Sequence, residues 1–180
     1  MINQQHNIFA DYMFSILTQF GDGIVVMAIG LLFFLFRKRR LGLAIAITYI
    51  GSGLICSLLK RSFLAYRPAH YLADDPSFHS VSWLPLAYHN AFPSGHTTSA
   101  FALACTIALF AKNKNWGRIA LGLAILCAYS RIYLGQHFAD DVWFGSVLGV
   151  SFSCAYALIL QRMEEKRLSL SHIFPPSFKL

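Results

Sequence analysis

Residues Ser130 to Asp141 read SRIYLGQHFADD, and this stretch holds the polar side chains around which the chain is organised. His137 and Asp141 are four residues apart, so a helix that begins near His137 would place both on one face. A carboxylate beside one imidazole nitrogen fixes the tautomer and directs the other nitrogen at a target. Arg131 adds a planar, permanently charged group suited to a phosphate. Taken alone, the stretch fits a structural polar pair as well as it fits catalysis.

The composition of the chain is that of a membrane protein. Of its 180 residues, 56% are apolar and 13% are charged, whereas about a quarter of the residues in a soluble domain are charged. Several apolar runs approach the roughly 20 residues needed to cross a bilayer. We therefore expect one all-α integral-membrane domain over residues 1–180, a bundle of about five to six transmembrane helices. The apolar runs lie at about 24–36, 41–59, 97–111, 119–134 and 141–160.

Three segments fall outside these runs. Residues 1–20 are expected to form an interfacial helix or the outer end of the first span. Residues 69–92 carry polar side chains and prolines, which predict an extracytoplasmic loop or cap; loops of this length are usually functional or mobile. Residues 168–180 are interpreted as a cytoplasmic tail. The four cysteines lie in apolar runs without metal-ligand spacing, so we expect buried free thiols. They are Cys56, Cys105, Cys127 and Cys154.

The distribution of basic residues predicts the orientation in the membrane. The net charge is +7, but the basic residues form short clusters between apolar runs, a pattern of membrane topology rather than of nucleic-acid binding. Residues 37–40, 112–118 and 162–179 contain eleven of the fifteen Lys and Arg residues. The positive-inside rule places these eleven in the cytoplasm. The remaining four, at Lys60, Arg61, Arg67 and Arg131, would then lie on the outer side.

Three clusters at the outer ends of different spans suggest a phosphate site. A helix that starts at Ser94 offers free N–H groups and the positive end of its dipole to an anion, and Gly95 permits close backbone approach. Lys60, Arg67 and Arg131 would add three positive charges around the phosphate oxygens. Taken singly, Lys60 and Arg67 fit interfacial anchors better than phosphate-binding residues. The coincidence of all three clusters on one side favours a shared site.

The same clusters contain the groups needed for phosphoryl transfer. His137, oriented by Asp141, is the candidate nucleophile on phosphorus. His96 lies on another helix and could protonate the leaving oxygen and later activate water. Asp140, three residues after His137, is also within reach of the imidazole. The spacing alone therefore does not decide which of the two carboxylates orients His137.

Together the clusters resemble the three signature motifs of the type-2 phosphatidic acid phosphatase superfamily, which includes membrane lipid phosphatases and soluble vanadium haloperoxidases. The resemblance implies metal-independent catalysis without a cofactor, with a phosphohistidine at His137, Asp141 as its partner and His96 as general acid. It also selects Asp141 over Asp140. The phosphate-binding residues that it implies are Lys60, Arg67, Ser94, Gly95 and Arg131. The motifs are Lys60-x6-Arg67-Pro68, Pro93-Ser94-Gly95-His96 and Ser130-Arg131-x5-His137-x3-Asp141.

The expected function is therefore dephosphorylation of a membrane lipid, in the bacterial cytoplasmic (inner) membrane with the active site facing the periplasm or exterior. Undecaprenyl diphosphate or a lipid A-type glycolipid phosphate is the preferred substrate, and phosphatidylglycerol phosphate or phosphatidic acid is the alternative. A protein that binds or transports anions or lipid phosphates is the competing class. Membrane-length apolar runs argue against a haloperoxidase. No nucleic-acid partner is expected, and the sequence leaves the oligomeric state open.

Overall fold

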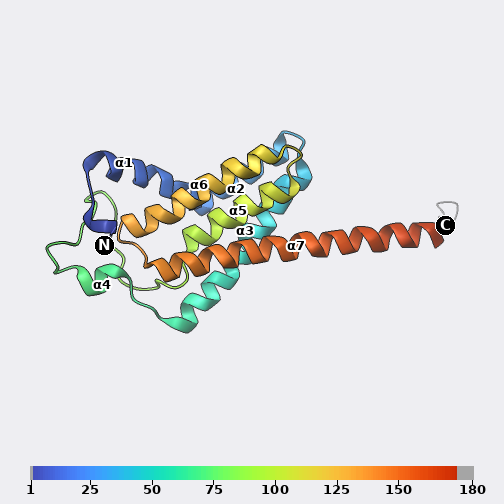
Figure 1. Ribbon diagram of the computed structural model, residues 1–180. Helices are drawn as coiled ribbons and strands as arrows, with labels where there is room; N and C mark the ends of the chain where they lie inside the picture. Colours follow the sequence, from blue (N-terminus) through green and yellow to red (C-terminus); the bar gives the residue numbers. More distant parts are fainter. Residues whose placement is uncertain (1, 174–180) are drawn as a thin grey trace.

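A computed structural model describes residues 2–173 of the chain, with side chains from 3 to 166. Within this range the protein is helical and contains no β-strand. Helix α5 lies at the centre of the bundle, with α3, α6 and α7 packed around it (Figure 1). The elements are η1 (Ile2–Gln4), α1 (Ile8–Leu17), η2 (Thr18–Gly21), α2 (Gly23–Leu35), α3 (Arg39–Phe63), α4 (Pro68–Leu72), α5 (Gly95–Phe110), α6 (Lys114–Tyr133) and α7 (Ala139–Ile173).

The five predicted apolar runs coincide with α2, α3, α5, α6 and α7. By length and apolar composition, two of the described helices are able to cross a membrane: α3, and α7 over Ala139–Lys166. The pair Ile8–Gly21 and Gly23–Leu35 makes a third if it is counted as one span bent by 57°. Helix α5 is apolar but has only 16 residues. The expectation of an all-helical protein is confirmed, whereas the count of five to six spans stays a prediction.

The bend near residue 22 follows from two local signals. Gly21 ends the 3-10 turn η2, and the Asp22 side chain caps α2 by accepting a hydrogen bond from Ile24 N at 2.8 Å. An Asp at this position satisfies one of the free amides at the helix start. Residues 1–20 are thus helical over Ile8–Leu17, and the placement of this segment at an interface or at the outer end of the first span stays a prediction.

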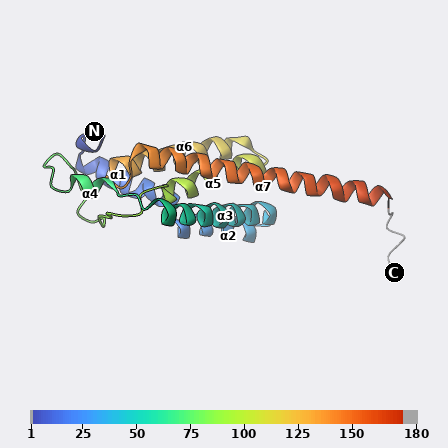
Figure 2. The same cartoon turned by 90° about the horizontal axis from the view of Figure 1, so that it is seen from below.

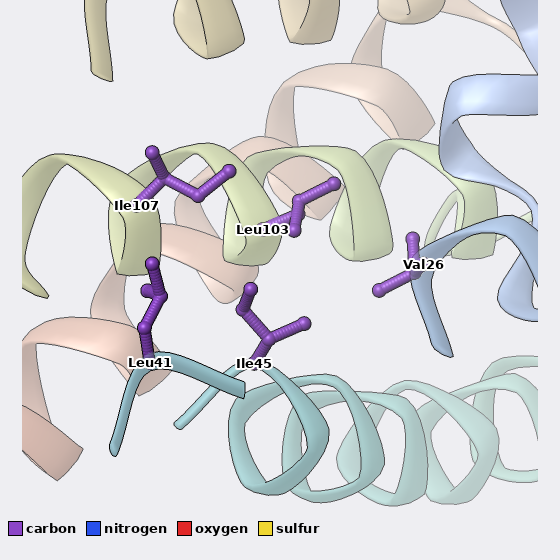
Figure 3. Packing of buried hydrophobic residues seen from close by; sticks show 5 residues of the cluster. All are labelled: Val26, Leu41, Ile45, Leu103 and Ile107. Carbon is purple, nitrogen blue, oxygen red and sulfur yellow. The ribbon is translucent and has the colours of Figure 1, made fainter. Parts of the chain in front are cut away.

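The apolar core joins α2, α3 and α5. Val26, Leu41, Ile45, Leu103 and Ile107 are buried and pack against one another (Figure 3). The α2–α3 contact is close because it is lined by small residues. A Cβ built on Gly42, in the first turn of α3, would lie 2.6 Å from the carbonyl oxygen of Gly30 in α2. Small residues at such contacts are typical of helices that associate in membranes.

Buried hydroxyl groups link α3, α5 and α7. Thr48 and Thr106 share a hydrogen bond of 2.9 Å, and Thr106 lies 3.3 Å from Ser153. These contacts satisfy polar groups that would otherwise be costly in an apolar bundle. The four cysteines are free thiols, as expected, but Cys105 and Cys154 are only half-buried.

The predicted loop and tail contain more structure than the sequence indicated. Residues 69–92 begin inside helix α4, and an isolated bridge joins Tyr66 to His89, so the segment is folded back on itself. It gathers with the N-terminal elements and the start of α7 at one end of the bundle (Figures 1 and 2). At the other end α7 projects beyond the bundle and continues to Ile173. The tail predicted over 168–180 is therefore helical up to that residue, and 174–180 lie outside the described residues.

Candidate active site

A tight turn after α6 delivers His137. The helix ends at Tyr133, and Gly135 adopts a φ of +64°, the left-handed conformation that favours glycine. Gln136 N donates to Arg131 O at 3.0 Å, and Gly135 N donates to Ile132 O at 3.1 Å. This pair of bonds is a Schellman motif. His137 N also donates to Arg131 O, at 3.1 Å, so the backbone of the arginine fixes the start of the histidine segment.

The predicted i,i+4 pair is in contact. His137 Nδ1 lies 3.3 Å from Asp141 Oδ2, and the two residues are 2% and 5% exposed. Asp141 Oδ2 also accepts from Phe138 N at 3.0 Å, which caps the first turn of α7. Asp140 is exposed and makes no hydrogen bond to the histidine in the described structure. Because Nδ1 is held by the carboxylate, Nε2 is the nitrogen available to a substrate.

The second motif forms the N-terminus of α5. Ser94 is the N-cap residue, fully buried, with Oγ 2.9 Å from Thr97 Oγ1 and accepting from Thr97 N at 3.4 Å. Its backbone N donates to Asp141 O at 3.0 Å, which joins α5 to α7. The donors that remain for an anion at this end are the amides of Gly95 and His96. A Cβ built on Gly95 would lie 4.0 Å from Lys60 Cε, so the lysine passes over this helix start.

Lys60 and Arg67 are half-buried and are held by backbone oxygens. Lys60 Nζ donates to Asn90 O at 2.6 Å. Arg67 Nε donates to His89 O at 2.9 Å, and its Nη1 donates to Gln136 O at 3.2 Å and to Gln136 Oε1 at 3.1 Å. The 69–92 segment thus returns to orient both cations. This explains why a long connection between α4 and α5 is folded against the end of the bundle.

Arg131 is 7% exposed and has one side-chain partner among residues 3–166. Its Nη1 donates to Thr18 Oγ1 at 2.8 Å, whereas Nε is buried without a hydrogen-bond partner. An unpaired buried donor costs about 1–3 kcal/mol, and more on a charged group. A bound anion would satisfy it. Neither Lys60, Arg67 nor Arg131 takes part in any of the ion pairs found in the described part of the chain, so their charge is available to an anion.

The electrostatics of His137 show that the three motifs converge. Burial, followed by the positive charges of Arg131, Arg67 and Lys60, holds the pKa of His137 well below its ordinary value of 6.5. The pKa of Arg67 is itself lowered by burial, against which the nearby Asp141 carboxylate acts. A neutral imidazole keeps the free electron pair that a nucleophile needs, and the cations around it could hold an anion beside it. Among the described residues, no group of three or more His, Cys, Asp or Glu side chains is arranged to hold a metal ion.

The structure brings all eight predicted site residues to one end of the bundle, but it also adds residues that the sequence did not indicate. Gln136 holds Arg67, and Thr18 holds Arg131. Gln136 lies within the third motif, immediately before His137, yet its neighbours in the sequence do not indicate its partner. Thr18 is 113 residues from its partner along the chain, and no local pattern points to such a contact.

The chain is similar to several known proteins. The chain is 34% identical over 136 residues to the lipid A 4'-phosphatase of Porphyromonas gingivalis, covering 70% of this chain and 56% of that protein. It is 30% identical over 169 residues to the lipid A 1-phosphatase of Rhizobium etli, covering 82% of this chain and 70% of that protein. The crystal structure of Aquifex aeolicus LpxE superposes with a TM-score of 0.76 at 28% identity, covering 87% of this chain and 90% of that one.

The profile of one family covers most of the chain and the whole candidate site. It matches residues 38–165, a range that contains every predicted site residue from Lys60 to Asp141 and leaves out α1 and η2. Together with the long apolar helices, the match identifies an integral membrane protein. The chain belongs to the PAP2 superfamily.

Proposed function

We propose that the protein is a phosphatase of a membrane lipid that acts without a metal ion, through a phosphohistidine at His137. The observation that carries the proposal is the placement of a buried imidazole, held by Asp141 at Nδ1, among three cations that have no carboxylate ion-pair partner in the described residues. An anion site of this kind stabilises the charge on a phosphoryl group in transit.

In the first step, His137 Nε2 attacks phosphorus, a P–N bond forms and the bond from phosphorus to the lipid oxygen breaks. His96, protonated beside the bound phosphate anion, donates its proton to that leaving oxygen and becomes neutral. The half-buried imidazole of His96 carries no hydrogen bond to a described residue, so it is free to reach a leaving group. Asp141 stabilises the positive charge that develops on the His137 ring.

In the second step, water attacks the phosphohistidine and the P–N bond breaks. His96, now neutral, takes the proton from this water and returns to its starting state. The products are inorganic phosphate and a lipid with one phosphate fewer. The proton that leaves His96 in the first step is recovered from water in the second, so the cycle balances with the lipid phosphate and water as the reactants.

For the substrate we infer a lipid phosphate of the lipid A glycolipid type, with undecaprenyl diphosphate as the second candidate. The support is the likeness to two lipid A phosphatases, which act at different positions of that lipid and so leave the position open. Phosphatidylglycerol phosphate and phosphatidic acid are the remaining alternatives. An outward-facing site in the cytoplasmic membrane fits the excess of basic residues at the opposite ends of the helices.

The experiment is phosphate release by detergent-purified protein in EDTA, measured against these four lipids. We expect release from one lipid class at the same rate with and without EDTA, and none from the His137→Ala variant. His6→Ala is the matched control, because His6 is exposed and its ring stacks on His79, which is not one of the predicted site residues. Labelled substrate quenched under alkaline conditions should leave phosphate on His137. If a folded protein releases no phosphate from any lipid, the site serves anion binding or transport instead.

A further inference from the structure

The short turn η2 lies against the second and third motifs, although it belongs to the N-terminal segment outside the family match. Thr18 opens this turn and is 3% exposed. Its Oγ1 accepts the hydrogen bond from Arg131 Nη1 at 2.8 Å, and its carbonyl oxygen lies 3.6 Å from Cys127 Sγ on the preceding turn of α6. Thr18 is therefore held against α6 through both its side chain and its backbone.

The contact with Thr18 leaves free the edge of the Arg131 guanidinium that is suited to bind a phosphate. A guanidinium binds a phosphate side-on through Nε and Nη2, two parallel donors on one edge. Thr18 takes Nη1, the nitrogen on the other side, and Nε has no partner in the described structure. A neutral hydroxyl also orients Arg131 without cancelling its charge, as a carboxylate in the same place would do.

Two further contacts hold η2 in place. Tyr133 OH donates to Asp11 Oδ1 at 2.8 Å, which ties α1 to α6 two residues beyond Arg131. At the other end of the turn, Gly21 lies so close to α5 that a Cβ would be 2.3 Å from His96 O. The turn is therefore wedged between the helix that carries Arg131 and the helix that carries His96.

We propose that Thr18 is a positioning residue of the active site: it holds Arg131 so that the Nε edge of the guanidinium faces the phosphoryl group. The N-terminal segment then completes a phosphate site whose other parts lie within residues 38–165. This inference rests on the proposed function, because it assigns Thr18 a role at that site.

The test compares three variants by steady-state kinetics and by inhibition with orthovanadate, an analogue of the phosphoryl group. Thr18→Val keeps the shape and removes the acceptor, and Thr18→Ser keeps the acceptor. Thr48→Val is the matched control, because Thr48 is also a fully buried threonine with a hydrogen bond to another helix, away from the site. Thr18→Val should lower kcat/KM and vanadate affinity by about tenfold to a hundredfold, the range for loss of a hydrogen bond to a charged group.

Thr18→Ser should keep kcat/KM and vanadate affinity within a fewfold of the native values. Thr48→Val should change thermal stability without changing vanadate affinity. The proposal is overturned if Thr18→Val binds vanadate as the native protein does, if Thr18→Ser is as impaired as Thr18→Val, or if Thr48→Val is equally impaired. Should Thr18→Val fail to fold, Thr18→Ala carries the same test.

A second measurement separates this proposal from the proposed function. Binding of inorganic phosphate and orthovanadate to the purified protein, by calorimetry, needs no turnover. If the native protein releases no phosphate from any lipid yet binds these anions, a loss of binding in Thr18→Val still supports the positioning role. If neither Thr18 variant alters anion binding, the role is wrong whatever the enzyme does.

Discussion

Replacing Gly21 by alanine tests whether η2 lies as close to the active site as the structure shows. The added Cβ would be 2.3 Å from His96 O and 2.8 Å from Cys127 Sγ. The first of these is a backbone atom at the start of α5, so the clash is relieved only by moving the turn or the helix. Overpacking of a core position costs about 1–3 kcal/mol. At this chain length each kcal/mol lowers the unfolding temperature by roughly 2–4 °C.

The same displacement should reduce activity, because the turn carries Thr18 and the helix start carries His96. We expect Gly21→Ala to lose at least about tenfold in kcat/KM, on the scale of the lost hydrogen bond to Arg131, with an apparent unfolding temperature lower by several degrees. Phosphate release and thermal unfolding of the same detergent preparation measure the two effects.

Gly53→Ala is the matched control for this change. Gly53 lies in α3, and nothing lies within 4 Å of a Cβ built on it. An alanine there should leave activity unchanged and stabilise the helix by roughly 0.5–1 kcal/mol. If Gly21→Ala is as active and as stable as the native protein, the turn does not pack against α5 and α6 as described. The positioning of Arg131 through this turn would then be wrong as well.

Three further predictions concern the site itself. Asp141→Asn should lower kcat by about 10²–10⁴, the range for general acid–base support. Asp140 is exposed, so Asp140→Asn should keep kcat within about twofold of the native value, as surface substitutions usually do. Steady-state kinetics of both variants test this difference. Because burial and nearby cations lower the pKa of His137, its neutral form persists as pH falls through 6.5. The acid limb of kcat/KM should therefore lie below that pH, and an NMR titration assigned with His137→Asn that places its pKa at or above 6.5 would contradict this. Gln136→Leu removes one of the two Gln136 acceptors of Arg67 Nη1 and should raise the Ki for inorganic phosphate by about tenfold, the lower end for a hydrogen bond to a charged group.

The features that the sequence predicted correctly are those set by short-range rules. The contact between His137 and Asp141 follows from a separation of four residues at a helix start. The helix start at Ser94 follows from the preference of serine for the N-cap position, which Ser94 occupies in the structure. The positions of the long helices follow from apolar runs of the right length. The number of membrane crossings does not follow from these rules, because α5 and α2 are shorter than a full span and α1 meets α2 at a bend.

The features that the sequence missed all depend on contacts between distant segments. The partner of Arg131 is on a turn 113 residues away, and Lys60 is oriented by a carbonyl oxygen of Asn90, which any residue type would supply. The hydrogen bond from the amide of Ser94 to the carbonyl oxygen of Asp141 joins segments that are far apart in the chain, and no local pattern indicates it. Backbone partners and tertiary hydroxyl contacts leave no periodic or compositional trace, so only the folded chain reveals them.

The partners of the three cations share one property that bears on how the site works. Lys60 and Arg67 are held by carbonyl oxygens of residues 89–90, and Arg131 is held by the hydroxyl of Thr18. All of these acceptors are neutral, so each cation is fixed in direction without a direct ion pair to a carboxylate among the described residues. A carboxylate in any of these places would fix the side chain equally well but would compete with phosphate for the same charge. Orientation by neutral oxygens thus lets a largely buried site remain electropositive before the substrate arrives, which is the condition for stabilising a phosphoryl group without reorganisation.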